Sequence, residues 1–332
     1  MKIYDLSMKN QMQREFSDNI SEEGLFILCN TSEVYKLGEL FEWDERTIEE
    51  RINFAEAVRH EFFHGYDIIS LVNMKIVDDS IIKLKIDIFV SNLYFVIIIP
   101  EQPDERLEEL EAILCYYLEN SDPNPYRIER LYHIVLSKLA ADFFDTLEKL
   151  EDDLELLSEI VSKNPSEQHI DLDKKLRKAA FSIKKILRTI SNINDEILLN
   201  ENGLLHKQQI PQFRSISNRF KELYSFAANL YDTSGEILSI YQSYITLEMN
   251  ATINRLTSTT VFLALISLIT GVFNIEFSFL PDIDTIIGYP LAIVIIAAIS
   301  VLIFRSSNKS NGIHKKQILK KHEKRLRKNF IH

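Results

Sequence analysis

The sequence predicts an α+β membrane protein, in which an N-terminal cytoplasmic α/β domain is followed by a long stalk helix that continues into the first of two transmembrane helices. Three observations predict this fold. Strand-like apolar runs occur within the first 125 residues, helical apolar spacing follows, and two uncharged runs lie near the end of the 332-residue chain. The length leaves room for about two domains.

The α/β domain, expected over residues 1–125, is indicated by two kinds of apolar run. Ile82 to Ile88 alternates between apolar and polar side chains, which is typical of a half-exposed strand. Tyr94 to Ile99 is continuously apolar, which indicates a buried strand. The predicted elements are strands over 24–40 and 67–100 and helices over 44–64 and 104–119.

After Pro123-Asn124-Pro125 the pattern becomes wholly helical. Residues 126–210 are expected to form a helical hairpin that packs on the first domain, because one apolar face runs from Leu131 to Val161 before Asn164-Pro165 interrupts it. Its second helix is predicted to begin at Asp171, a good N-cap residue, and to end near Leu199.

A third helix is predicted from Pro211, which suits a first helical turn. No proline follows until Pro281, so this stalk helix (211–255) is expected to run unbroken into the membrane. At 1.5 Å per residue, the stretch from Pro211 to Asn274 would be roughly 95 Å long.

Two uncharged runs of 20 residues predict transmembrane helices over 256–275 and 285–304, since each would span roughly 30 Å, the thickness of a bilayer core. The loop between them, 276–284, holds three acids and no base, whereas the tail, 305–332, is strongly basic. The positive-inside rule therefore places both termini in the cytoplasm and the protein in the inner (plasma) membrane. A nucleic-acid-binding tail is the alternative, but no aromatic interleaving supports direct nucleic-acid binding.

A row of polar and small residues follows one helical face through the stalk and into the first apolar run, with an average step of 3.5 residues. A polar face inside a bilayer must meet another protein chain or a water-filled pore. Tight helix packing through small residues is the alternative, but the row keeps its phase outside the membrane, which favours a pore. One hairpin cannot enclose a pore, so homo-oligomers are expected. The row comprises Ser215, Asn218, Glu222, Ser225, Asn229, Asp232, Glu236, Ser239, Ser243, Thr246, Asn250, Ile253, Thr257, Thr260, Ala264, Ser267, Gly271 and Asn274.

The segment from Asn250 to Pro290 resembles the CorA-type two-span metal-ion transporters. Asn250 to Thr257 is similar to the N-x-x-M-x-x-L-T of that family, Gly271-Val272-Phe273 to its Gly-Ile-Tyr, and Gly288-Tyr289-Pro290 to its Gly-Tyr-Pro. With a weaker similarity over Phe89 to Val161, the resemblance covers about two thirds of the chain. It implies a homopentameric funnel around the stalk and transport of a divalent cation such as Mg²⁺.

The resemblance also implies site residues. Ile253 and Leu256 are expected to form a hydrophobic gate that dewets the closed pore. At the outer mouth, Asn274, Ile275 and Glu276 stand where the family has Gly-Met-Asn, whose Asn ring holds hydrated Mg²⁺. A ring of Glu276 carboxylates would attract cations, so Glu276 is the metal-binding candidate, a solvated loop position being the alternative. The implied pore-lining positions are Asn250, Ile253, Leu256, Thr260, Ala264, Ser267 and Gly271.

The sequence does not identify the signal that opens the channel. The family is closed by Mg²⁺ bound between cytoplasmic domains, but the acids of the stalk do not align with such a sensor, and the acidic run from Glu148 to Glu155 is typical of a solvated helix face. Divergent relatives beside type III CRISPR systems resemble antiviral effectors gated by a nucleotide-type second messenger, which would need a basic or aromatic pocket. A non-conducting membrane scaffold is the second alternative.

An enzyme is not expected, although His60-Glu61-Phe62-Phe63-His64 fits HExxH by letter. On a helix the two histidines would bind Zn²⁺ and Glu61 would act as general base, but no third ligand is evident. Cys29 and Cys115 lack metal-ligand spacing and are expected to be buried small apolar side chains in a reducing compartment.

Overall fold

The computed structural model describes residues 1–6, 13–14, 24–53, 58–77, 80–99, 105–120 and 127–273, together with residues 294 and 298. The second predicted span, the loop before it and the basic tail therefore lie outside the described residues, apart from Val294 and Ala298, which are helical. The division into a stalk, two spans, a loop and a tail stays a prediction.

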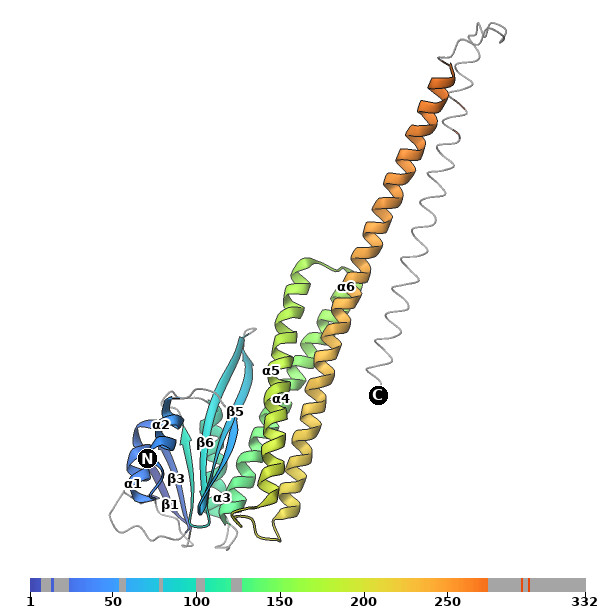
Figure 1. The fold of residues 1–332 in the computed structure, drawn as a ribbon. Coiled ribbons are helices and arrows are strands. Elements are labelled where there is room, and N and C mark those ends of the chain that lie inside the picture. Colours follow the sequence, from blue (N-terminus) through green and yellow to red (C-terminus); the bar gives the residue numbers. More distant parts are fainter. Residues whose placement is uncertain are drawn as a thin grey trace. The chain divides into compact units, whose positions relative to one another are not determined.

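The described part of the α/β region is built on a seven-stranded mixed sheet with the order β2-β1-β3-β7-β6-β5-β4 (Figure 1). Among the described strands only β3 and β7 pair in parallel, and both are almost entirely buried, as their continuous apolar sequences predict. The strands are β1 (Lys2–Asp5), β2 (Gln13–Arg14), β3 (Leu25–Asn30), β4 (Arg59–Phe63), β5 (Tyr66–Val77), β6 (Ser80–Ser91) and β7 (Tyr94–Ile99).

Two helices, α1 (Val34–Leu40) and α2 (Glu45–Asn53), cover one face of the sheet (Figure 1). The core on this face is centred on Trp43, which is 5% exposed and stacks on Phe89 with ring centroids 4.0 Å apart. The indole Nε1 donates to the hydroxyl of Tyr94 over 2.8 Å, so the one polar atom of this buried ring has a partner.

The opposite face of the sheet is covered by α3 (Glu105–Asn120) and α4 (Arg127–Lys163), which contribute side chains such as Tyr132, whose ring lies 6.1 Å from that of Phe95. Cys115 on α3 is half-buried and its Sγ lies 3.3 Å from the hydroxyl of Tyr4, whereas Cys29 in β3 is buried. The helix predicted over 104–119 is confirmed by α3.

Two of the predicted elements are wrong in part. Residues 24–40 form only one strand, β3, before a 3₁₀ turn (Thr31–Glu33) and α1. The helix expected over 44–64 ends with α2, and Arg59–Phe63 becomes the edge strand β4 because each of its residues pairs with β5. Pairing with a long neighbouring strand outweighs the weak helical preference of this segment.

The remaining helices are α5 (Glu167–Leu199) and α6 (Ile210–Phe273). The N-cap predicted at Asp171 is wrong, because α5 begins one turn earlier, directly after Pro165-Ser166. The unbroken helix predicted from Pro211 is confirmed: α6 is 64 residues long, which corresponds to about 96 Å at 1.5 Å per residue.

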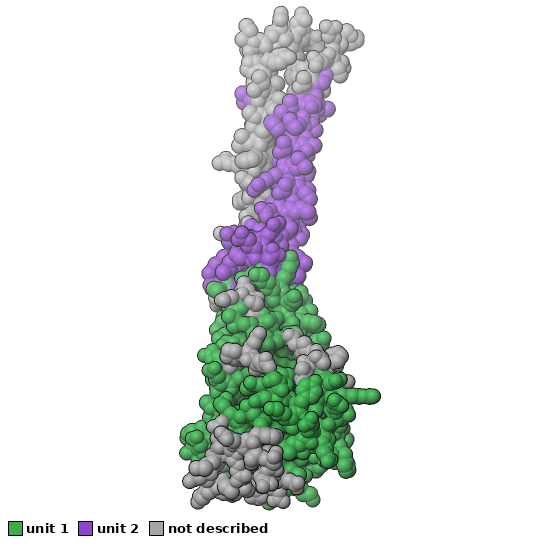
Figure 2. Space-filling model, turned by 90° about the vertical axis from the view of Figure 1, so that its left-hand side faces the viewer, with its two compact units in different colours: residues 1–156, 172–235 green, residues 157–171, 236–332 purple. Residues whose placement is uncertain are grey.

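The chain divides into two compact units, shown in different colours in Figure 2. Unit 1 comprises residues 1–156 and 172–235, and therefore holds the sheet, most of α4 and α5 and the first part of α6. Unit 2 comprises residues 157–171 and 236–332, and its described residues include the rest of α6. The polar row on α6 has members in both units and is described below for each unit separately, whereas the other candidate sites lie in unit 1.

Candidate functional site

Within unit 1, α6 buries one face against α4 and α5. Its buried side chains recur at steps of three and four, as expected for an amphipathic helix. The ring of Phe226 lies 6.4 Å from that of Phe144 on α4, and the Ser217 hydroxyl donates to Asp195 on α5 over 2.9 Å. The buried residues are Phe213, Ile216, Ser217, Phe220, Leu223, Ala227, Leu230 and Ser234.

The polar row predicted from sequence lies on the other face of α6. In unit 1 all six of its members are exposed: Ser215, Asn218, Glu222, Ser225, Asn229 and Asp232. A helix that buries its apolar face against its own chain and leaves a continuous polar face uncovered is ready to line a water-filled space or to meet further copies.

In unit 2 the row continues along α6, and every position that the CorA-type resemblance marks as pore-lining is exposed: Asn250, Ile253, Leu256, Thr260, Ala264, Ser267 and Gly271. Ile253 is 51% exposed and Leu256 is 68% exposed. Apolar side chains off the row are exposed as well, Val261 at 46% among them, so polarity rather than exposure separates the row from the rest of the helix.

Among the described residues, α6 is the one helix that is long and apolar enough to cross a membrane, and none of its most apolar window is buried. Between Arg255 and Glu276 the sequence holds no charged residue. An unburied apolar helix of this length is costly in water and stable in a bilayer. Asn274, Ile275 and Glu276, the residues expected at the outer mouth, lie outside the described residues.

Hydroxyl groups on this part of α6 bond to the helix backbone. The Thr260 hydroxyl donates to the carbonyl of Leu256 over 2.9 Å, and that of Thr246 to Gln242 over 2.8 Å. Because the hydroxyl hydrogen is used in this way, the oxygen keeps its lone pairs for an outside donor or a cation. Thr260 therefore offers an uncharged oxygen acceptor on the polar row within the apolar segment.

The HExxH-like segment does not form a zinc site of the predicted kind. His60 lies in strand β4 and His64 lies one residue past its end. In an extended chain these two positions lie about 13 Å apart along the backbone, whereas the HExxH motif needs them one turn apart on the same face of a helix. The His60 side chain is fully buried, with Nε2 3.2 Å from Asp67 and Nδ1 3.3 Å from Glu196, so its ring nitrogens already have partners.

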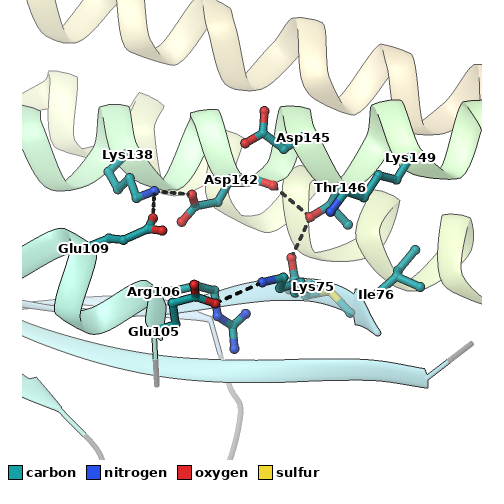
Figure 3. A pocket seen from close by; sticks show the side chains of 11 residues that line it. Lys75, Ile76, Glu105, Arg106, Glu109, Lys138, Asp142, Asp145, Thr146 and Lys149 are labelled. Atoms are coloured by element: carbon teal, nitrogen blue, oxygen red, sulfur yellow. Dashed lines mark hydrogen bonds and ion pairs between the residues drawn. The ribbon is translucent and has the colours of Figure 1, made fainter. Parts of the chain in front are cut away.

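A second candidate site, which the sequence did not reveal, is a hollow of about 150 Å³ between β5, α3 and α4 in unit 1 (Figure 3). Lys138 lies at its wall, with Nζ 2.6 Å from Glu109 on α3 and 2.8 Å from Asp142 on α4. Burial alone would lower the pKa of Lys138, but these two carboxylates outweigh it and raise the pKa. Thr146 donates to the carbonyl of Met74 on β5 over 3.0 Å.

The charges around this hollow balance, since four cations and four acids line it: Lys75, Arg106, Lys138, Lys149, Glu105, Glu109, Asp142 and Asp145. Lys75 lies 3.7 Å from Glu105, which adds a third ion pair to the two made by Lys138. Among the residues that the structure describes, no group of three potential metal ligands is present. The hollow is thus a polar junction that ties the sheet edge to two helices.

Comparison with known proteins gives a consistent result. Residues 28–305 match the model of the family described as CorA-like Mg²⁺ transporter protein. The chain is 21% identical over 276 residues to the cobalt/magnesium transport protein CorA of Thermotoga maritima, covering 82% of this chain and 77% of that protein.

Two solved structures share the fold. The complete structure of the CorA magnesium transporter from Methanocaldococcus jannaschii superimposes with a TM-score of 0.75 at 18% identity, over 92% of this chain and 96% of that one. The full-length CmaX protein superimposes with a TM-score of 0.67 at 14% identity, over 92% and 96% of the two chains.

Proposed function

Because this chain belongs to the family of CorA-like Mg²⁺ transporter proteins, we propose that it forms an oligomeric cation channel in the inner membrane, with α6 lining the pore. The observation that carries the proposal is the polar row on α6. Apart from the half-buried Ser243, the row is exposed along the described helix, and it continues without a change of phase from the charged part into the uncharged part. Several copies, as the predicted pentamer has, would enclose a pore by facing this row toward one axis.

The chemistry of the row favours cations over anions. Its members between Arg255 and Glu276 are hydroxyls, small residues and an amide, with no basic side chain. Hydroxyl oxygens bonded as that of Thr260 is present acceptors to the pore, and oxygen acceptors suit hard cations such as Mg²⁺. The cation is the transported substrate of the proposed channel. A ring of Glu276 at the outer mouth would add negative charge in place of the amide ring of the family.

Gating by the cytoplasmic domain is supported by a tie between that domain and the loop before α6. Asn202 in this loop donates from Nδ2 to the carbonyls of Phe63 and Tyr66, over 2.9 and 3.3 Å, and to the carboxylate of Asp67. The β4–β5 hairpin thus holds the chain just before α6 begins. A rearrangement of the sheet edge would reach α6 through this loop.

Flux through the purified protein in liposomes tests the proposal. Ile253→Ser removes the large apolar side chain of the expected gate, and we expect basal cation flux to rise on the order of tenfold. Val261→Ser is the matched control, since Val261 is similarly exposed but lies off the polar row, and its flux should equal that of the parent. Equal flux through parent and Ile253→Ser would place the gate elsewhere. No ion flux in any state would favour a membrane scaffold.

A further inference from the structure

One face of α5 is strongly basic although the chain as a whole is acidic, with a net charge of −11. Between residues 174 and 188 this helix carries seven basic residues and no acid. We define the basic face as Lys178, Phe181, Lys185 and Arg188, which recur at steps of three and four and are all exposed. Phe181 is 54% exposed, so an aromatic ring lies among these cations without cover.

Two further cations flank this face and are held in place by Tyr231 of α6. The guanidinium carbon of Arg177 lies 4.7 Å from the centroid of the Tyr231 ring, and Nζ of Lys184 lies 5.0 Å from it. The ring of Phe181 is 5.9 Å from the same tyrosine. Stacked contacts of this kind fix long side chains. Among the described residues, by contrast, Lys178, Lys185 and Arg188 have no ion pair.

The neighbouring helix α4 carries the complementary surface. We define the acidic face as Phe144, Glu148, Asp152 and Glu155, again at steps of three and four and all exposed. Phe144 is 43% exposed. Burial and then the nearby Asp152, Glu155 and Glu148 raise the pKa of Glu151 beside this face, which reflects the crowding of like charges there.

The two faces do not neutralise each other within one chain, since no ion pair joins these acids to the basic face among the described residues. They do lie at matching positions along their helices. Asp152 lies 11 residues before the last residue of α4, Lys163. Lys178 lies 11 residues after the first residue of α5, Glu167. In an antiparallel hairpin this puts both at the same height, about 16 Å from the turn.

From these observations we infer that the basic face of one copy docks on the acidic face of the next copy around the channel. The inference rests on the proposed oligomer. Copies in a closed ring are related by rotation without a shift along the axis, so two different faces can pair around the ring only if they lie at one height. Each face also presents an exposed phenylalanine among charges, which is the composition of an interface with an aromatic centre and a polar rim.

A second copy fits the basic face better than a polyanion does. Acidic residues outnumber basic ones in the whole sequence, and the excess is larger still before Ser300, because the tail after it is basic. The net negative charge of the chain repels nucleic acid at long range. The acidic face of a neighbouring copy, by contrast, is already held close by the rest of the assembly. The hollow of unit 1 is lined by other residues than those of the basic face.

Charge reversal tests the inference. The α5-reversed variant carries K178E, K185E and R188E, and the full-length protein is examined in detergent by mass photometry. We expect the concentration at which half of the assembly dissociates to rise at least about tenfold, because three attractive contacts per interface become repulsive. Raising the salt concentration should weaken the parent assembly in the same direction.

The α4-reversed variant carries E148K, D152K and E155K and should dissociate similarly. A chain with both reversals restores opposite charges across each interface, so it should assemble like the parent, and this rescue excludes misfolding as the cause. A control variant reverses three exposed cations on other elements, K36E, R46E and K207E, and should assemble normally.

The outcomes separate the two proposals. An assembled parent whose oligomer withstands both reversals would overturn the docking of these faces and leave the channel untouched. A monomeric parent would instead refute the oligomeric channel itself, and the docking with it. If the α5-reversed variant assembles normally but no longer binds a fluorescein-labelled single-stranded oligonucleotide that the parent binds, the face serves nucleic acid and the inference is wrong.

Discussion

Ser234→Ala tests whether a buried hydrogen bond fastens the first part of α6 to α5. The Ser234 hydroxyl donates to a carboxylate oxygen of Asp173 over 2.8 Å, and the two residues are 0% and 1% exposed. Hydrogen bonds to charged groups contribute about 1.5–3 kcal/mol, and burial removes solvent screening. We therefore expect the free energy of unfolding to fall by about 2 kcal/mol, which corresponds to roughly 3 °C in Tm for a chain of 332 residues at about 2.1 cal/mol/K of unfolding entropy per residue.

The loss should depend on pH. Burial raises the pKa of Asp173, while the bond from Ser234 and the charge of Arg177 oppose this rise. A carboxyl whose folded pKa is raised costs stability above that pKa, and the cost is relieved as pH falls through it. Without Ser234 the pKa rises further, so the difference between variant and parent should be largest at neutral pH and should shrink toward about pH 4.

Thermal unfolding of the full-length protein in detergent, at several pH values, measures this difference. Asp173→Asn provides the second arm of a double-mutant cycle, because adding Ser234→Ala to it should cost less than about 1 kcal/mol. If Ser234→Ala costs the same in both backgrounds, or costs nothing at neutral pH, the bond does not contribute as reasoned.

Three further changes have defined outcomes. Gly38→Ala should cost about 1–2 kcal/mol, because the added Cβ would collide with Cδ1 of Ile48; adding Ile48→Val removes that atom and should restore Tm. His60→Ala should leave zinc content, measured by mass spectrometry, at the background level of the parent, while Tm falls because two carboxylates lose their partner; stoichiometric zinc in the parent alone would contradict this. Asn202→Ala should lower Tm by an amount equivalent to about 2 kcal/mol and should alter the cation flux, whereas unchanged flux would argue against gating through this loop.

The helical half of the fold is predictable because its signals are long and periodic. The apolar face from Leu131 to Val161 and the absence of proline after Pro211 are properties of the local sequence, and α4 and α6 follow them. The predicted start of α5 is wrong because Asp171 is a good N-cap by type, although the chain can already turn into a helix directly after Pro165.

The sheet is less predictable, because its edges are decided by partners far along the chain. The sequence of Arg59–Phe63 taken alone predicts a helix, but in the fold this segment is a strand because it pairs with β5. Lys2–Asp5 gives little signal alone, yet it adds to the sheet by pairing with Leu25–Leu28 of β3. Non-local pairing of this kind leaves no periodic trace in a short segment.

The candidate sites also differ in how far the sequence predicts them. The polar row on α6 follows from its 3.5-residue spacing, whereas the hollow beside Lys138 depends on three elements that only the fold brings together. The basic face of α5 has a clear signal in the sequence, since seven cations and no acid lie between residues 174 and 188. The acidic run on α4 is typical of a solvated face when taken alone, because its counterpart lies on a different helix.

Trp43 gives the α/β domain an optical signature of its own. It is the single tryptophan of the chain, it is buried, and its indole is stacked on Phe89 and bonded to Tyr94. Emission excited at the red edge of protein absorbance would therefore come from one place, the segment between α1 and α2 that packs on the sheet. A ligand that reshapes this domain would change that emission in the unlabelled protein, whereas events confined to the pore helix would leave the emission as it was.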